Sequence, residues 1–86
     1  MPRTLTYSPD ADRFGEVVRQ HRKRLGWTKK KLAQRAGLTP QYVGIVEEGG
    51  NVPSLDTVLE LLEVLGADTG EVMRYLAEER RKPAKQ

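Results

Sequence analysis

Apolar residues recur along the chain at intervals of three and four positions, which is the period of amphipathic helices rather than of strands. The segment at residues 55–66 has the broadest apolar face. On this face we expect six side chains to be buried: Leu55, Val58, Leu59, Leu61, Leu62 and Leu65. In all, the pattern indicates five helical segments, at residues 9–25, 29–36, 40–48, 55–66 and 68 onward. It therefore predicts a small all-α fold.

Short polar residues mark the starts of these segments. Candidate N-caps are Ser8 with Pro9, Thr28, Thr39 with Pro40, Ser54, and Asp68 with Glu71 in a capping box. Gly37 follows the second segment and permits the positive φ that a sharp inter-helix turn demands. The second and third helices, of about eight residues each, are too short to be stable alone, so their neighbours must hold them.

The two chain ends differ from the segments between them. Residues 1–8 form an N-terminal arm whose tract Arg3–Tyr7 alternates, and this tract is interpreted either as a strand or as a loose arm. Residues 9–77 are expected to form one domain. Residues 78–86 are the charged end of the fifth helix and a frayed tail containing Pro83.

Composition excludes several kinds of chemistry. The 86 residues suit one small domain with little room for a substrate cleft. There is no cysteine, and a lone histidine, His21, cannot form a His-rich zinc centre, so we expect no metal and no cofactor. No apolar run reaches the roughly 20 residues of a membrane span, and the N-terminus lacks a signal-peptide core. A cytoplasmic protein is expected.

Charge is divided unevenly between the two halves of the chain. Residues 1–46 contain ten Lys or Arg and three Asp or Glu, whereas residues 47–86 contain five and nine. The halves therefore carry about +7 and −4, although the whole carries +3. A basic face of this kind suits a polyanion such as nucleic acid. The alternative is that these charged residues lie on solvent-exposed helix faces and bind no nucleic acid.

The stretch Lys29–Glu48 has the small and apolar residues that two short helices meeting at a tight turn require. They are Leu32, Ala33, Ala36, Gly37, Leu38, Val43 and Val46. Ala33 is small where the two helices cross closely, and Val43 and Val46 belong to the inward face of the third helix. We interpret this stretch as a DNA-reading helix-turn-helix formed by the second and third helices.

Longer motifs extend the pattern over most of the chain. They are FGEVVR followed by Arg22, then GWT at 26–28, LA with AGL at 32–38, Val43 with Val46-Glu47, PSL at 53–55 and Leu65-Gly66. From Phe14 to about Leu76 the chain resembles the phage-repressor/Cro-type (XRE-like) helix-turn-helix regulators of bacteria and phages. The resemblance implies a compact five-helix repressor-type domain. It also implies a transcriptional regulator, a repressor or an autoregulating controller, that binds double-stranded DNA.

The resemblance places five residues of the third helix toward the bases of the major groove: Pro40, Gln41, Tyr42, Gly44 and Ile45. Gln41 is the best candidate for direct readout, because its amide both donates to and accepts from adenine. Tyr42 reaches a phosphate or a base edge, and Ile45 meets a thymine methyl. Pro40, Gly44 and Ile45 offer no side-chain hydrogen bond, so DNA shape is expected to contribute to specificity.

A second set of residues is expected to contact phosphates: Thr28, Lys29, Lys30, Thr39, Asn51 and Arg19. The family usually has a polar residue, often glutamine, where this chain has Lys29, and often serine at the position of Gly44. Three consecutive lysines at a helix N-terminus oppose the helix dipole, but a bound phosphate would receive both the lysines and the free N–H groups. The alternative is that the lysines only face solvent.

Two further expectations follow from the resemblance. Arg22 and Glu47 match an arginine and a glutamate that pair in the family, the alternative being two solvated charges. A homodimer is expected on a palindromic operator, with half-sites about 34 Å apart. The candidate dimer residues are Val72, Met73, Tyr75 and Leu76, each of which belongs either to the interface or to the core. The Arg3–Tyr7 tract is another candidate for pairing across the two-fold axis.

Other function classes find less support. A protein-binding module, such as an antitoxin that binds a toxin or an adaptor, remains the alternative, although only Glu78–Gln86 is available as a separate tail. The exposed carboxylates Glu60 and Glu63 have no nucleophile or paired base nearby, and Gly49-Gly50 lacks the spacing of a nucleotide motif. We do not expect an enzyme.

Overall fold

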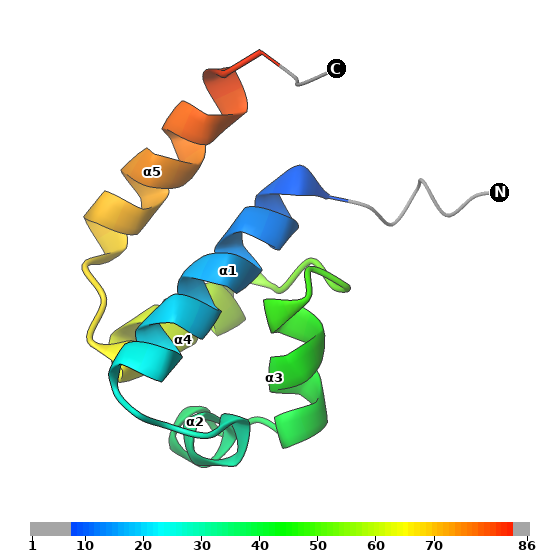
Figure 1. Cartoon of the computed structure of the whole chain (residues 1–86), viewed down its shortest axis with the longest axis vertical. Helices are drawn as coiled ribbons and strands as arrows, with labels where there is room; N and C mark the ends of the chain where they lie inside the picture. Colours follow the sequence, from blue (N-terminus) through cyan, green and yellow to red (C-terminus); the bar gives the residue numbers. More distant parts are fainter. Residues whose placement is uncertain (1–7, 84–86) are drawn as a thin grey trace, which may run out of the picture.

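The structure, a computed structural model, describes residues 8–83 of the chain. Five helices follow one another: α1 (Pro9–Arg24), α2 (Lys29–Ala36), α3 (Pro40–Glu47), α4 (Leu55–Leu65) and α5 (Thr69–Arg81) (Figure 1). No strand occurs within the described range. The predicted all-α, five-helix fold is confirmed. The Arg3–Tyr7 tract lies outside the described residues.

Each helix begins at the polar residue that the sequence indicates. The five N-cap side chains, of Ser8, Thr28, Thr39, Ser54 and Asp68, accept a hydrogen bond from a backbone N–H three residues further on, at 3.0–3.1 Å. Each such cap is typically worth about 1 kcal/mol. Gly37 ends α2 with a φ of 71°, as the predicted tight turn requires. The helix boundaries are therefore encoded locally.

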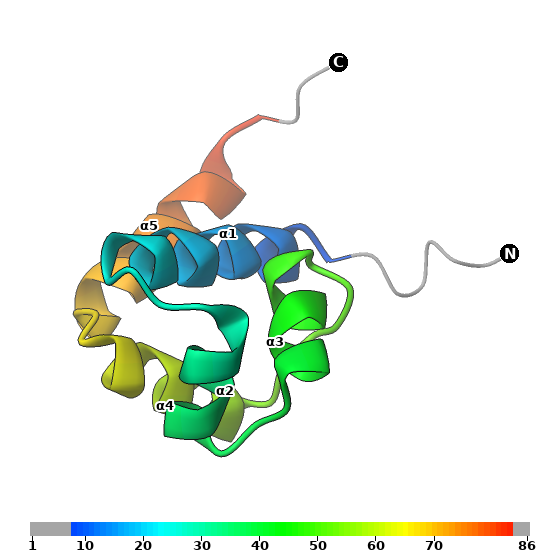
Figure 2. The same cartoon turned by 60° about the horizontal axis from the view of Figure 1, so that its bottom comes forward.

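The central element is α1, which contacts α3, α4 and α5. The helix-turn-helix pair, α2 and α3, lies on one side of α1, and α5 lies on the other side (Figures 1 and 2). The α4 helix contacts α1, α2 and α5 and so closes the core from below α1 in the view of Figure 2. Within residues 8–83, this arrangement leaves one long face of α3 without a neighbouring helix.

All five helices contribute to a single core. Its largest fully buried side chains are Val18 of α1, Leu32 of α2, Val43 and Val46 of α3, and Leu61 and Leu62 of α4. The same buried cluster also contains Phe14, Ala33, Ala36, Leu65 and Val72. The inward face predicted for α3 is thus confirmed, because Val43 and Val46 are both buried. Their burial fixes which residues of α3 point outward.

The apolar face of α4 is narrower than the sequence predicts. Leu55 and Leu59 are expected to be buried but are 70% and 42% exposed. At about 100° per residue, the six apolar positions spread over roughly 160° of the helix surface. Leu55 and Leu59 lie at one edge of that arc, whereas Leu61, Leu62 and Leu65 lie where the neighbouring helices cover it.

One of the candidate dimer residues is also reassigned. Val72 is 6% exposed and belongs to the core cluster, because its side of α5 packs onto α1 and α4. Leu76 is half-buried against the same cluster. Met73 and Tyr75 are exposed. Only these last two offer substantial free apolar surface on α5.

Two helices approach each other closely at Gly15, where α1 crosses the end of α3. A Cβ on Gly15 would collide with the carbonyl oxygen of Val46 and would lie 2.8 Å from that of Glu47. Only a residue without a side chain allows the two backbones to meet there. The sequence pattern predicts a close crossing at Ala33, which is buried, and gives no such indication for Gly15.

No helix in residues 8–83 is both long enough and apolar enough to cross a membrane.

Candidate nucleic-acid interface

The outward face of α3 is a direct consequence of how its inner face packs. Val43 and Val46 are buried, so Pro40, Gln41 and Ile45 project to solvent. An isolated helix of eight residues, the length of α3, is unstable in water. The core therefore supplies a short helix with a fixed and accessible face.

Tyr42 lies beside this face and joins it to the loop that follows α3. Its ring packs partly against the core, and its hydroxyl is hydrogen-bonded to Asn51 Oδ1 at 3.1 Å. Two residues that the sequence places separately at the DNA are therefore in contact. The bond fixes the loop after α3 relative to the N-terminal half of the helix.

The three consecutive lysines have different surroundings. Lys29 and Lys30 are exposed, whereas Lys31 places its ammonium 6.0 Å from the ring centre of Trp27. The guanidinium of Arg35 lies 5.3 Å from the same ring, and Trp27 itself is half-buried. Cation–π contacts of this kind are worth about 0.5–1 kcal/mol at exposed sites. Nothing in the sequence pattern indicates that Trp27 would engage two of these cations.

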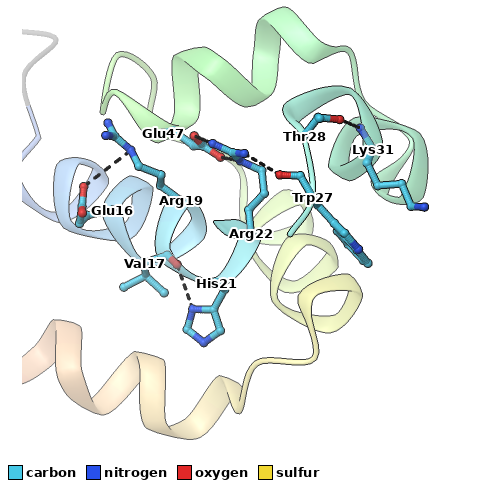
Figure 3. Close-up of polar contacts among 9 residues, drawn as sticks. All are labelled: Glu16, Val17, Arg19, His21, Arg22, Trp27, Thr28, Lys31 and Glu47. Atoms are coloured by element: carbon cyan, nitrogen blue, oxygen red, sulfur yellow. Dashed lines mark hydrogen bonds and ion pairs between the residues drawn. The ribbon is translucent and has the colours of Figure 1, made fainter. Parts of the chain in front are cut away.

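Arg22 and Glu47 connect α1 to the C-terminal end of α3, as the resemblance implies (Figure 3). Arg22 donates from Nε to Glu47 Oε2 at 2.6 Å and from Nη2 to Oε1 at 3.0 Å. A third bond runs from Nη1 to the carbonyl oxygen of Trp27 at 2.8 Å. The Glu47 carboxylate raises the pKa of Arg22 above its ordinary value, against the opposing effect of burial.

A basic cleft of about 280 Å³ opens where α1, α2 and α3 meet. It is lined by Arg19, Lys23 and Lys29 and by the Arg22–Glu47 pair with Glu48. Arg19 stands 4.0 Å from Glu16 in a loose ion pair, so its charge is only partly neutralised within the protein (Figure 3). Cations from α1 and α2 thus gather beside α3.

His21 takes no part in this interface. Its Nδ1 lies 2.9 Å from the carbonyl oxygen of Val17, one turn earlier in α1 (Figure 3). Within residues 8–83, no group of three or more His, Cys, Asp or Glu side chains is arranged to hold a metal ion. The arrangement is one of donors and cations around a helix face, which suits binding to a polyanion rather than chemical catalysis.

The fold and this face together define a helix-turn-helix DNA-binding protein. A model of the helix-turn-helix domain family matches residues 13–76. The chain therefore belongs to the Cro/C1-type (XRE-like) helix-turn-helix family of DNA-binding transcriptional regulators, which are not enzymes. The family predicted from the sequence is confirmed.

Two relatives support this assignment. A helix-turn-helix-type transcriptional regulator of Methanothermobacter thermautotrophicus is 36% identical over 63 residues, which cover 73% of this chain and 91% of the relative. The regulator YgzD of Bacillus subtilis is 34% identical over 62 residues, covering 72% and 92%. Both are uncharacterized, so they support the class and add no target.

Solved structures show the same fold. The restriction-modification controller protein C.AhdI from Aeromonas hydrophila is 34% identical with a TM-score of 0.70, over 76% of this chain and 98% of that one. The clp gene regulator ClgR from C. glutamicum has a TM-score of 0.76 over 88% and 99%, but at 22% identity it supports the fold alone.

Proposed function

We propose that the protein is a homodimeric, sequence-specific regulator, a repressor or an autoregulating controller, whose α3 enters the major groove of its operator. The observation that carries this proposal is the outward face of α3, held by the core and flanked by the N-terminus of α2. Residues at the start of a recognition helix are those that reach base edges. Gln41 is exposed at that position.

Base readout on this face depends on few hydrogen-bonding groups. Gln41 offers both a donor and an acceptor, which matches adenine N6 and N7. Exposed Ile45 suits a thymine methyl, whereas Pro40 and Gly44 offer no side-chain hydrogen bond. The Tyr42 hydroxyl donates its hydrogen to Asn51 Oδ1, so its oxygen is left to accept a hydrogen bond from a base amino group of the DNA. A sparse face of this kind leaves part of the specificity to DNA shape.

Phosphate contacts complete the docking on both sides of α3. The proposed contacts are Thr28, Lys30, Thr39, Asn51 and Arg19, all of which are exposed or half-buried. The N-terminus of α2 contributes free N–H groups to a phosphate oxygen in addition to the lysine charge. Such contacts set register and overall affinity and carry no sequence information of their own.

Dimerisation is proposed through the side of the molecule that carries α5. Met73 and Tyr75 are exposed there, and Met73 and Leu76 line a largely apolar groove of about 380 Å³ together with Val52 and Leu55. Met73, Tyr75 and Leu76 belong to the half of the chain with net negative charge, which disfavours DNA at this surface. A protein partner such as a toxin on the same surface is the alternative, and the mass of the purified species distinguishes the two.

The test of base readout is Gln41→Ala, measured by fluorescence anisotropy on the chain's own promoter DNA and on random DNA. Loss of a bidentate base contact should weaken specific binding about 5- to 150-fold, from roughly 1–3 kcal/mol, and leave non-specific binding unchanged. Gln20→Ala is the matched control, because Gln20 is exposed on α1 and lines a groove with α5. An equal loss on both DNA classes would exclude Gln41 from base reading.

Footprinting on the same promoter DNA tests whether two subunits bind. A footprint should reveal two protected half-sites about 34 Å apart, or a multiple of one helical turn. A single short protected site together with a monomeric mass would contradict the dimer.

A further inference from the structure

The side chain of Lys29 extends from the start of α2 to the outward face of α3, where it lies beside Gly44. A Cβ on Gly44 would stand 3.7 Å from Lys29 Nζ and 3.9 Å from its Cδ. The end of the lysine therefore runs along the place from which a side chain at position 44 would project. Because residue 44 has no side chain, that place is open to the ammonium.

The ammonium of Lys29 keeps its charge available. Among the described residues, no carboxylate oxygen lies within 4.0 Å of it, although Glu47 and Glu48 line the same cleft. From the sequence alone, Lys29 and Lys30 are expected to share one role as phosphate contacts. In the structure Lys30 does not line this cleft, and none of its atoms comes within 4 Å of a Cβ built on Gly44.

Positions 41 and 44 are adjacent on the surface of α3, because residues three apart on a helix are neighbours. An ammonium held over Gly44 is therefore about one turn of α3 from the position of Gln41, at the edge of the face that is proposed to point to the bases. It carries three donors and no acceptor. In the major groove, guanine presents two acceptors, O6 and N7, whereas adenine presents N7 beside an amino donor.

We propose that Lys29 is a specificity-determining residue that reads a guanine from α2, in the space that Gly44 leaves open on α3. The assignment rests on the proposed docking of α3 in the major groove. It moves Lys29 from the expected phosphate contacts to the base contacts. It also explains how a recognition helix with glycine at its centre retains hydrogen-bonding readout at that point: the donor comes from the neighbouring helix.

The test uses a panel of operators in which each G·C pair is replaced in turn by A·T. Wild-type protein should lose about 5- to 150-fold in affinity at one G·C pair beside the position read by Gln41. Lys29→Ala should remove the preference at that pair alone, and Lys29→Arg should keep it, since arginine also binds guanine O6 and N7. Lys30→Ala, the matched control, should weaken binding to all operators by one factor.

Substitutions at Gly44 test the same geometry from the other helix. Gly44→Ala should preserve the guanine preference, because a Cβ there makes only ordinary contact with Lys29. Gly44→Leu should abolish it at the pair affected by Lys29→Ala, because the larger side chain occupies the path of the lysine. Circular dichroism melts of each variant establish that the domain is folded.

The outcomes separate this assignment from the proposed function. If Lys29→Ala lowers affinity by one factor on every operator, as Lys30→Ala does, Lys29 contacts phosphate only and the assignment is wrong while the proposed function stands. If wild-type protein binds all operators equally, the proposed function and the assignment both fail.

Discussion

The Arg22–Glu47 pair should stabilise the domain in the absence of DNA. The Arg22 and Glu47 side chains are 9% and 2% exposed, and two of the three hydrogen bonds of the guanidinium go to this carboxylate. Glu47→Ala would leave Arg22 buried with only the carbonyl oxygen of Trp27 as partner. Breaking one side of a buried pair costs about 3–5 kcal/mol, because the remaining charge is stranded.

That cost is large relative to the stability of a domain of this size. At about 0.05–0.15 kcal/mol per residue, 86 residues give a free energy of unfolding of roughly 4–13 kcal/mol. One kcal/mol shifts the melting temperature of such a domain by about 4–8 °C, so Glu47→Ala should lower it by at least about 12 °C. The measurement is urea and thermal unfolding followed by circular dichroism, without DNA.

Two comparisons keep this prediction refutable. Glu48→Ala is the matched control, because Glu48 is the adjacent carboxylate but is exposed, and it should change stability by less than about 0.5 kcal/mol. If Glu47→Ala does not fold, Glu47→Gln should, since the amide oxygen still accepts a bond from Arg22. Equal unfolding midpoints for the Glu47→Ala and Glu48→Ala variants would refute the reasoning.

Two further changes test packing and electrostatics elsewhere. Gly15→Ala should destabilise the domain by about 1–3 kcal/mol in urea unfolding, because the added Cβ meets the backbone of α3. Gly44→Ala, the comparison, should stabilise the domain by up to about 1 kcal/mol, because alanine favours a helix more than glycine does. Equal unfolding midpoints for the two variants would contradict the close crossing at Gly15. Lys82 donates a hydrogen bond to Glu79 at 2.7 Å and lowers the pKa of that carboxyl below its ordinary value of 4.5. The stabilisation is complete above that value and is lost as the pH falls through the lowered pKa. Lys82→Ala should raise the Glu79 midpoint in an NMR titration, and an unchanged midpoint would exclude the contact in solution.

Helix starts were predictable because the signals that encode them are local. A capping side chain bonds a backbone N–H only three residues away, as Thr28 and Thr39 do, so residue types within one turn suffice. The turn at Gly37 is local in the same way. Periodicity then identified the inward face of α3, because Val43 and Val46 repeat at helical spacing. These local signals were sufficient to predict both the helix-turn-helix and the solvent-exposed side of α3.

Features that depend on the distance between helices were not predictable from the pattern. Gly15 carries no mark that distinguishes it from any other helical glycine, yet it is where α1 and α3 touch. Leu55 and Leu59 have the same period as the buried leucines, and only the positions of α1, α2 and α5 show that they are uncovered. Arg22 and Glu47 are 25 residues apart, so their pairing came from the resemblance and not from spacing.

The position of the proposed reading face depends on contacts within the protein. At its N-terminal end α3 is fixed by the Thr39 cap, and at its C-terminal end Glu47 bonds to Arg22 of α1. Because Gly15 lets α1 approach beneath the same end, any change that widens this crossing should move Gln41 relative to the lysines of α2. Base contacts require donors within a few tenths of an ångström of their acceptors, whereas phosphate contacts by flexible lysines tolerate more. Substitutions that loosen the junction of α1 and α3 should therefore reduce sequence discrimination before they reduce overall affinity for DNA.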